Sequence, residues 1–487
     1  MKLNKQTLRQ LPAAVQRPAY DRSQVVPAIV HLGVGAFHRA HQAVYTDAVL
    51  ASGDLGWGII GAGMVSDHMK QALQPQDGLF TLIERGAGFE KAQVIGSIVE
   101  LLGPPGDLAR LLTIMSAPTT RIVSLTVTEK GYYLDPATGA LQIDAPAIAQ
   151  DLVNPTTPRT ILGLIVQALK HRKAAGIAPF TVLSCDNLAN NGKRAKAAVL
   201  AFARQVDVAL ADWIAAEVRF PCTMVDRITP ATTDADRAYL SEHYGVEDAW
   251  PVVTEQFTQW VVEDNFTMGR PDWTLGGAFF SNEIETWEAM KLRCLNGAHS
   301  TLAYMGQLCG QETVDAAMAT PLIAKLLDAL WAEVLEVLHA PKGVDANAYV
   351  DSLKQRFRNP SLKHRTQQIA MDGSQKLPQR LLAPLRERIA RGLPSPTITT
   401  AIAAWMHFVV KKAYTPDAVL SDPLASDLLA RAKVRTDAAG IVAQLLSIDK
   451  IFGADLPANA TFRAAVLAGF TQLGRHPDVA AASPIQY

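Results

Sequence analysis

The sequence predicts an α/β fold in its first part and a mostly α-helical second part. Short apolar, β-branched runs alternate with helical patterns up to about residue 280, and long amphipathic patterns dominate from about residue 285. Buried strands that alternate with helices are typical of a doubly wound, largely parallel sheet. We therefore expect two domains, at residues 1–284 and 285–487.

The composition favours a soluble enzyme of a reducing compartment, which we expect to be the cytoplasm. The 487-residue chain is 49% hydrophobic, enough for a sizeable core, and its 46 basic residues balance 46 acidic ones. This balance argues against a dominant nucleic-acid-binding surface. Four cysteines do not indicate a disulfide framework in a chain of this size. Neither a signal peptide nor an apolar run of membrane-spanning length is recognisable, so we expect no membrane partner.

Individual elements follow from short stretches of the sequence. Apolar runs predict strands at residues 28–35, 57–63, 121–129 and 180–187. A helical pattern lies at 159–176, between the last two strands. In the second part, apolar residues recur at helical spacing over residues 321–340, 379–393 and 399–414.

A glycine turn follows the first expected strand in AIVHLGVGAFHRAH. In a dinucleotide-binding turn, a first glycine such as Gly33 permits the sharp turn, and a second such as Gly35 lets pyrophosphate approach the next helix. His38 stands where a third glycine is expected, and a plain turn is the alternative. The strand before the turn and the helical segment 39–51 after it favour a Rossmann-type domain. The candidate cofactor residues in this stretch are Gly33, Gly35, Ala36, Phe37, His38 and Arg39.

Three further residues bear on the choice of cofactor. Arg39 could add a charge for phosphate, or it could be a solvated helix residue. Asp67 follows the second expected strand, where an acid can accept hydrogen bonds from ribose hydroxyls and thereby favour NAD. Capping of the next helix is the alternative for Asp67. His68 beside it could tolerate a 2′-phosphate, which leaves NADP open.

The stretch MKLRCLNGAHS carries Lys291, Asn296 and His299 among apolar and small residues. A desolvated lysine can have its pKa lowered toward neutrality and act as a general base, and an amide can donate to a developing alkoxide. On an ideal helix Asn296 and His299 share a face, but Lys291 lies about 140° from Asn296. A long lysine stem, or a helix break near Gly297, would have to close that gap. A salt-bridged lysine and a satisfied buried histidine are the alternative.

Other polar residues follow expected strands. Asn187 ends FTVLSCDN, and ligands sit at the carboxyl ends of strands in open α/β sheets. Glu129 ends another expected strand, and helix capping or loop roles are the alternatives for both residues. Asp226 lies in the polar stretch FPCTMVDRITP. The spacing of the cysteines and the lack of an HExxH motif argue against a metal site.

Taken together, these segments resemble the mannitol dehydrogenase family of polyol-specific long-chain dehydrogenases. The resemblance runs in order over nearly the whole chain, through HLGVGAFHRAHQAVYTD, SLTVTEKGY, SCDN, FPCTMVDRITP, QWVVEDNFTMGRPDW and MKLRCLNGAHS. It implies a Rossmann-type domain, a helical C-terminal domain and metal-free hydride transfer between NAD(P) and a secondary alcohol. Members are often monomeric, so a single chain is expected to suffice.

The resemblance also implies roles for individual residues. Lys291, Asn296 and His299 match a KxxxxNxxH motif, in which the lysine takes the alcohol proton and the histidine orients the substrate. Asn296 would stabilise the alkoxide together with Asn187. Glu129 resembles an acid that gates proton exit, and Asp226 matches an acid on the substrate side.

The substrate is expected to be a linear polyol and its 2-ketose, with D-mannitol and D-fructose as the leading pair. The alternative is D-mannonate and D-fructuronate, because residues 359–380 look more like fructuronate reductases. Lys376 and Arg380 in this segment could contact a substrate carboxylate, or they could lie on the surface. A zinc-dependent polyol dehydrogenase and a non-enzymatic sugar- or nucleotide-binding protein are the rival classes.

Overall fold

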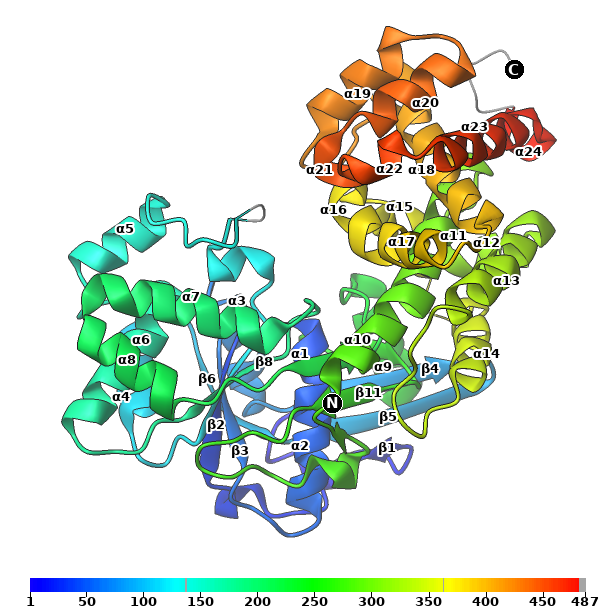
Figure 1. The fold of residues 1–487 in the computed structure, drawn as a ribbon. Coiled ribbons are helices and arrows are strands. Elements are labelled where there is room, and N and C mark those ends of the chain that lie inside the picture. Colours follow the sequence, from blue (N-terminus) through cyan, green and yellow to red (C-terminus); the bar gives the residue numbers. More distant parts are fainter. Residues whose placement is uncertain (136–137, 362, 481–487) are drawn as a thin grey trace. The chain divides into compact units, whose positions relative to one another are not determined.

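The structure is a computed structural model that describes residues 1–135, 138–361 and 363–480. The chain divides into two compact units, Met1–Glu285 (unit 1) and Thr286–Tyr487 (unit 2), and Figure 1 traces both. Among the described residues, no helix is long and apolar enough to cross a membrane.

Unit 1 holds the strands. They are β1 (Val15–Gln16), β2 (Pro27–Leu32), β3 (Gly58–Ala62), β4 (Phe80–Gly86), β5 (Phe89–Ile95), β6 (Ile98–Leu102), β7 (Ile122–Leu125), β8 (Thr181–Ser184), β9 (Thr223–Asp226), β10 (Val252–Glu255), β11 (Gln259–Val262) and β12 (Phe279–Phe280). Its α-helices are α1 (Ala36–Ala40), α2 (Gln42–Ala51), α3 (His68–Leu73), α4 (Leu108–Ser116), α5 (Pro146–Val153), α6 (Ile161–Ala174), α7 (Asn191–Val206), α8 (Val208–Glu217) and α9 (Asp234–Tyr244). Short 3₁₀ turns are η1 (Leu8–Gln10), η2 (Arg22–Gln24), η3 (Gln74–Gln76), η4 (Glu129–Tyr132) and η5 (Trp273–Gly276).

The central sheet has the order β6-β3-β2-β7-β8, and all of its strand pairs are parallel. Strand β2, the first of these five strands in the chain, is central, and the later strands extend the sheet on both sides of it. This is the Rossmann-type, doubly wound order, so the predicted fold class of the first part is confirmed. Its topological switch point lies between β2 and β7, where open α/β sheets bind their ligands.

Successive residues of the central strands face opposite sides of the sheet. On β2, Val30 and Leu32 belong to a buried cluster with residues of α4, α6, α7 and α8. Ile29 belongs to a second cluster, with residues of α2, β4 and β11. The layer of α4, α6, α7 and α8 beside the sheet is visible in Figure 1. Both faces of the sheet are therefore covered, as a parallel sheet requires.

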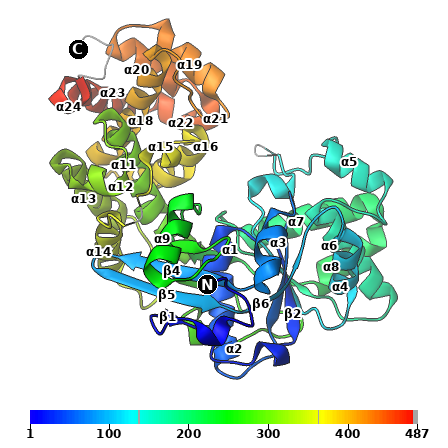
Figure 2. The ribbon, with the colours of Figure 1, turned by 180° about the vertical axis from the view of Figure 1, so that it is seen from behind.

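Two smaller sheets of unit 1 were not predicted from the sequence. Their orders are β1-β5-β4-β10 and β12-β11-β9. Strands β4 and β5 pair antiparallel, and Figure 2 shows them side by side. The turn between them contains Gly88 with φ +73°, a conformation that glycine adopts readily. The alternation in FTLIERG and FEKAQVI was the signal for this hairpin.

Unit 2 is helical, as predicted. After α10 (Ile284–Met290), which spans the boundary between the units, its helices are η6 (Lys291–Asn296), α11 (Gly297–Leu308), α12 (Val314–Ala319), α13 (Pro321–Leu335), α14 (Ala346–Phe357), α15 (Thr366–Ile369), α16 (Gly373–Leu377), η7 (Pro378–Leu382), α17 (Ala383–Ala390), α18 (Pro396–Tyr414), α19 (Ala425–Val434), α20 (Ala438–Leu446), α21 (Asp449–Phe452), α22 (Asp455–Ala458), α23 (Ala460–Arg475) and α24 (Pro477–Ala480). Two of these segments, η6 and η7, are π-helical.

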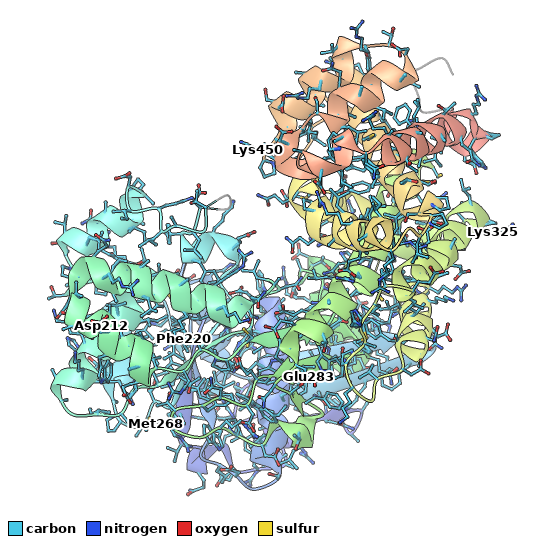
Figure 3. All side chains as sticks on the ribbon, viewed as in Figure 1. Asp212, Phe220, Met268, Glu283, Lys325 and Lys450 are labelled. Atoms are coloured by element: carbon cyan, nitrogen blue, oxygen red, sulfur yellow. The ribbon has the colours of Figure 1, made fainter. Side chains whose placement is uncertain are left out.

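The amphipathic patterns explain how these helices pack. On α13, Ile323 and Leu327 are fully buried, whereas Lys325, labelled in Figure 3, is exposed. The helix ends at Leu335, although the pattern predicted helix as far as residue 340. Helix α18 is buried along most of its length and packs against α11, α19 and α23.

Candidate active site

The glycine turn lies at the carboxyl end of β2, at the switch point of the central sheet. Gly33 has φ +103°, and its N–H donates to the Ala62 carbonyl at 2.8 Å. A Cβ on Gly33 would lie 2.2 Å from the Thr126 carbonyl oxygen at the end of β7, so only glycine fits there. A Cβ on Gly35, in contrast, would meet only the Gly33 oxygen, at 3.9 Å. The space in front of Gly35 is thus open, as a backbone that a phosphate approaches requires.

Buried histidines brace this turn from behind. His31 contacts Ser124 through Nδ1 at 2.8 Å, and its Nε2 lies 3.1 Å from the Gly33 oxygen. His38, in α1, stacks on His31 with 3.4 Å between ring centroids. Burial lowers the pKa of His31 to about 3 and that of His38 well below its usual value, so both rings are neutral. His38 therefore contributes shape rather than charge to the turn.

The structure contradicts one of the two roles that were expected of Arg39. Its side chain is fully buried, and its guanidinium donates to the Trp250 carbonyl and lies over the Phe80 ring at 5.2 Å. The solvated alternative is therefore wrong. The phosphate role of Arg39 stays a prediction.

The helical segment expected at residues 39–51 is broken. Helix α1 ends at Ala40 and α2 begins at Gln42, with His41 at φ −125° and ψ −99° between them. His41 packs against Phe37 at 4.8 Å and against the edge of Trp260 at 5.3 Å between ring centroids. Tertiary packing of this ring accompanies a break that the helical pattern did not predict. Ala36 and Phe37 lie half-buried in the first turn of α1.

Asp67 and His68 lie at the start of α3 and are exposed. Asp67 occupies the N-cap position of the helix, but its side chain makes no capping hydrogen bond. Instead its Oδ2 accepts from Gln71 Nε2 at 2.8 Å. The Asp67 side chain therefore does not cap the helix, and the capping alternative is wrong in this respect. Its exposed carboxylate is accessible to a ligand. The His68 ring contacts Trp250 edge-on, with 4.4 Å between centroids.

Glu129 and Asn187 lie in loops beyond the carboxyl ends of β7 and β8. The strand expected at 121–129 ends at Leu125, and Glu129 begins the turn η4. Asp186 joins the two loops: it accepts from the Val127 and Thr128 N–H groups at 2.9 and 2.8 Å. Thr128 has φ +63° and ψ +170°, a strained conformation that these bonds help to hold. Asp186 is structural, whereas its neighbour Asn187 is exposed.

The other two candidate acids of unit 1, Glu129 and Asp226, differ in how far they are exposed to solvent. Glu129 is half-exposed, with its carboxylate 3.9 Å from the Arg194 guanidinium. Asp226 is the last residue of β9, is 3% exposed and pairs with Gln259 of β11 in the smaller sheet.

The lysine stretch adopts a π-helical conformation, which removes the misalignment expected on an ideal helix. In η6 the Gly297 N–H donates to the Leu292 carbonyl, five residues back. A turn closed by such bonds brings residues five apart, such as Lys291 and Asn296, onto one face. His299 follows three residues later in α11 and shares that face. The expected break near Gly297 is wrong, because Gly297 is helical at φ −62° and ψ −48°.

All three side chains on this face are buried. Lys291 is 6% exposed, Asn296 7% and His299 8%. His299 stacks on Phe357 at 4.5 Å and meets His364 edge-on at 5.7 Å. Its Nε2 has no hydrogen-bond partner, which is costly unless a ligand supplies one.

Positive groups surround His299. Burial lowers its pKa well below the usual value, and the groups that lower it further are, in decreasing order of effect, His364, Arg356, Arg380 and Lys376. Lys376 is half-buried, and its ammonium donates to the Ile369 carbonyl at 3.1 Å. Burial lowers the pKa of Lys376 to about 8. Lys376 and Arg380 therefore face the interior of unit 2 around His299, and the surface alternative is wrong for them.

Sequence reasoning missed His364, Arg356 and Ser300, although His364 lies in a segment that was singled out for its substrate. A lone polar residue in a helical region has no periodic signal. The spacing of five between Lys291 and Asn296 was the one signal for the π-helical turn. Among the described residues, no group of three or more His, Cys, Asp or Glu side chains is arranged to hold a metal ion.

Comparisons with known proteins cover nearly the whole chain. The family model for the mannitol dehydrogenase Rossmann domain matches residues 27–275, and the model for the mannitol dehydrogenase C-terminal domain matches residues 283–473. D-mannonate oxidoreductase of Escherichia coli is 45% identical over 465 residues, which is 94% of this chain and 96% of that protein.

Two solved structures match this chain over almost its whole length. Mannitol 2-dehydrogenase of Pseudomonas fluorescens, in a ternary complex with NAD and D-mannitol, is 40% identical with a TM-score of 0.87. That match covers 99% of this chain and 98% of the other. A D-sorbitol dehydrogenase in substrate-free form is 34% identical with a TM-score of 0.90, over 99% and 100% of the two chains.

Proposed function

Because the chain belongs to the mannitol dehydrogenase family, we propose that it is an NAD-dependent dehydrogenase of a secondary alcohol. The alcohol lies on a linear polyol or on the corresponding sugar acid. The observation that carries the proposal is the π-helical face of unit 2, on which a buried amine, an amide and an imidazole gather. Such a set can bind a hydroxyl group and remove its proton.

The residues of unit 1 fit a dinucleotide. Gly33 makes the turn, Gly35 leaves open space for the pyrophosphate, and the exposed Asp67 carboxylate can accept from the ribose hydroxyls. Bound NAD would supply the hydride acceptor. The carboxylate of Asp67 repels a 2′-phosphate, so NAD is favoured over NADP.

In unit 2, each residue has a distinct task in our proposal. The Lys291 amine takes the proton of the substrate hydroxyl as a hydride leaves the carbon that bears this hydroxyl. The Asn296 amide donates to the oxygen as negative charge develops there. Asn187 of unit 1 keeps the amide-donor role that the family resemblance implies. His299, through its unpartnered Nε2, binds a neighbouring hydroxyl of the substrate. Glu129 and Asp226 of unit 1 keep the proton-exit and substrate-side roles that the resemblance implies.

The charges around His299 favour a sugar acid as the substrate. Arg356, Arg380 and Lys376 all raise the positive potential at its imidazole. A cationic site with partly desolvated walls attracts a carboxylate much more strongly than a neutral hydroxymethyl group. We therefore propose D-mannonate and D-fructuronate as the reacting pair. Lys376 is the first candidate for the carboxylate contact.

D-mannitol and D-fructose are the second candidate pair. The polyol and the sugar acid differ only in the terminal group, so the same lysine, amide and imidazole would serve both. The P. fluorescens relative, solved with D-mannitol, is 40% identical over almost all of the chain.

The test is the oxidation of NADH and of NADPH, followed at the nicotinamide absorbance, with D-fructuronate and D-fructose side by side. We expect faster turnover with NADH and a higher kcat/KM for D-fructuronate. A higher kcat/KM for D-fructose would favour the second pair instead. Binding of NADH without oxidation by either ketose would contradict the enzymatic proposal. Repeating the assay after exhaustive chelation tests the metal-free mechanism, which requires full activity.

A further inference from the structure

The two π-helical segments of unit 2 pack against each other. Segment η6 carries Lys291 and Asn296, and η7 carries Arg380. Their backbones approach so closely that a Cβ on Gly297 would lie 3.1 Å from the Arg380 carbonyl oxygen. π-Helical turns are rare, so two of them in contact beside the candidate base call for a physical cause.

The Arg380 side chain crosses from η7 to the lysine helix. Its Nη1 donates to the Asn296 carbonyl oxygen at 3.3 Å and to the Ser300 hydroxyl at 3.0 Å. Burial lowers the pKa of Arg380 only to about 10, so the guanidinium stays charged at neutral pH. Asn296 is the last π-helical residue, and Ser300 lies in the first turn of α11, where the helix returns to the α pattern.

A charged donor at this junction stabilises the change of helix type. At the junction, hydrogen bonds five residues apart give way to bonds four residues apart. Asn296 is the N-cap of α11, so its carbonyl accepts the first α-helical bond, and the guanidinium adds a second, charged donor to the same oxygen. Charge-assisted bonds of this kind are roughly twice as strong as neutral ones. Without them, a return of η6 to the α pattern would turn Lys291 away from the face of Asn296 and His299.

We propose that Arg380 is a positioning residue, which holds the π-helical turn that aligns Lys291 with Asn296 and His299. Its role in catalysis rests on the proposed function of those residues. Because it acts through the helix, Arg380 then affects kcat for every substrate alike, whereas its positive charge near His299 affects only the KM of D-fructuronate. A substrate contact would act only on the substrate that it binds.

The first part of the test compares variants by kinetics. Arg380→Met should lower kcat by about 10²-fold for D-fructuronate and D-fructose alike, because small displacements of catalytic groups cost that much. Its KM for NADH should not change. Arg380→Lys, which keeps one charged donor, should recover part of kcat, and Ser300→Ala should lower kcat only about fivefold. A loss confined to the KM of D-fructuronate would overturn the proposal and make Arg380 a substrate contact.

A matched control is Arg386→Met. Arg386 lies in α17 and pairs with Asp455, at 2.6 and 2.9 Å, on the exposed side of unit 2. The substitution removes the same side chain together with its hydrogen bonds to a neighbouring segment, so it reports the general cost of losing an arginine from unit 2. We expect wild-type kcat for it.

The second part of the test does not depend on activity. Hydrogen exchange of peptides that cover residues 291–301 should be faster in Arg380→Met than in wild type, whereas Arg386→Met should leave it unchanged. Wild-type protection in a folded Arg380→Met protein would overturn the proposal, whatever the kinetics. Should Arg380→Met fail to fold, Arg380→Lys must show an intermediate increase in exchange. If wild type oxidises NADH with neither ketose while exchange still responds to Arg380, the proposed function fails and the positioning role stands.

Discussion

The two units present their candidate residues in contrasting ways. In unit 1 all of them but Asp226 follow the carboxyl ends of parallel strands, in a sheet whose switch point the strand order alone determines. In unit 2 they lie on a local exception to the α-helix, held by an arginine more than 80 residues away in the chain. The order of the strands thus brings the candidate residues of unit 1 together, whereas a rare helical turn and a long-range contact align those of unit 2.

The electrostatics differ as well. The histidines behind the glycine turn of unit 1 are neutral, since burial lowers the pKa of His31 to about 3. The imidazole of His299 in unit 2 experiences the positive charges of Arg356, Arg380 and Lys376. We infer that unit 1 recognises its ligand mainly through backbone shape, and that unit 2 recognises its ligand through side-chain charge.

The sharpest test of this contrast is Lys291→Ala. Loss of a general base should lower kcat by about 10²–10⁴-fold, because no other side chain takes the substrate proton. The dissociation constant of NADH should stay within about twofold, since the cofactor residues belong to unit 1. Steady-state kinetics and fluorescence titration measure the two quantities.

Lys325→Ala is the matched control, because that lysine is exposed on α13 (Figure 3). It should behave as wild type in both measurements. Turnover near the wild-type rate in Lys291→Ala would remove the catalytic assignment. A loss of NADH affinity of the same size as the loss in kcat would remove the division of labour between the units.

Within unit 1, Gly33→Ala and Gly35→Ala should separate folding from binding. Gly33→Ala forces a side chain into φ +103° and against the Thr126 carbonyl, so thermal stability and NADH affinity should both fall. The conformational strain alone costs about 1–2 kcal/mol. Gly35→Ala meets no close neighbour, so it should fold with wild-type stability but lose about tenfold or more in NADH affinity, because its methyl group fills the open space.

The control for backbone strain is Gly277→Ala. Gly277 has φ +92° and a Cβ there would meet nothing within 4 Å. This variant should lose stability without losing NADH affinity. If Gly35→Ala binds NADH as wild type does, the assignment of this turn to the pyrophosphate is wrong.

The same contrast explains what the sequence could predict. Strand and helix periodicity predicted the doubly wound sheet and the helical second part, because burial imposes those periods on any sequence of this fold. The break at His41 and the burial of Arg39 were not predicted from the sequence. His41 packs against Trp260 and Arg39 donates to the Trp250 carbonyl, and both partners lie more than 200 residues later in the chain. The π-helical turn was not predicted either, because the residue that we propose holds it, Arg380, contacts it from a distant part of the chain. Local periodicity cannot encode a partner that is distant in the chain.

The charge of unit 2 should appear as a pH dependence. Burial lowers the pKa of Lys376 from its ordinary value to about 8, so the ammonium is present below pH 8 and is lost as the pH rises through that value. The KM for D-fructuronate should therefore increase above about pH 8, by up to about tenfold per pH unit. The KM for D-fructose should not follow, because a neutral substrate gains nothing from the charge.

Lys376→Met provides the check. It should raise the KM for D-fructuronate at pH 7 and abolish the increase above pH 8, while it leaves the pH profile of NADH binding as in wild type. A wild-type rise in KM in this variant would mean that another group titrates, and it would remove Lys376 from the carboxylate site.

The smallest expected effect concerns the cofactor. Asp67→Ala should weaken NADH binding by about tenfold, the worth of one or two hydrogen bonds to a charged group at an exposed site. NADPH binding should improve, because the repulsion of the 2′-phosphate is removed. Gln71→Ala, which only frees Asp67 Oδ2 from its present donor, should leave NADH affinity unchanged or slightly higher. Unchanged affinity for both cofactors in Asp67→Ala would show that unit 1 recognises its dinucleotide by backbone shape alone. The two units would then differ still more in how they recognise their ligands.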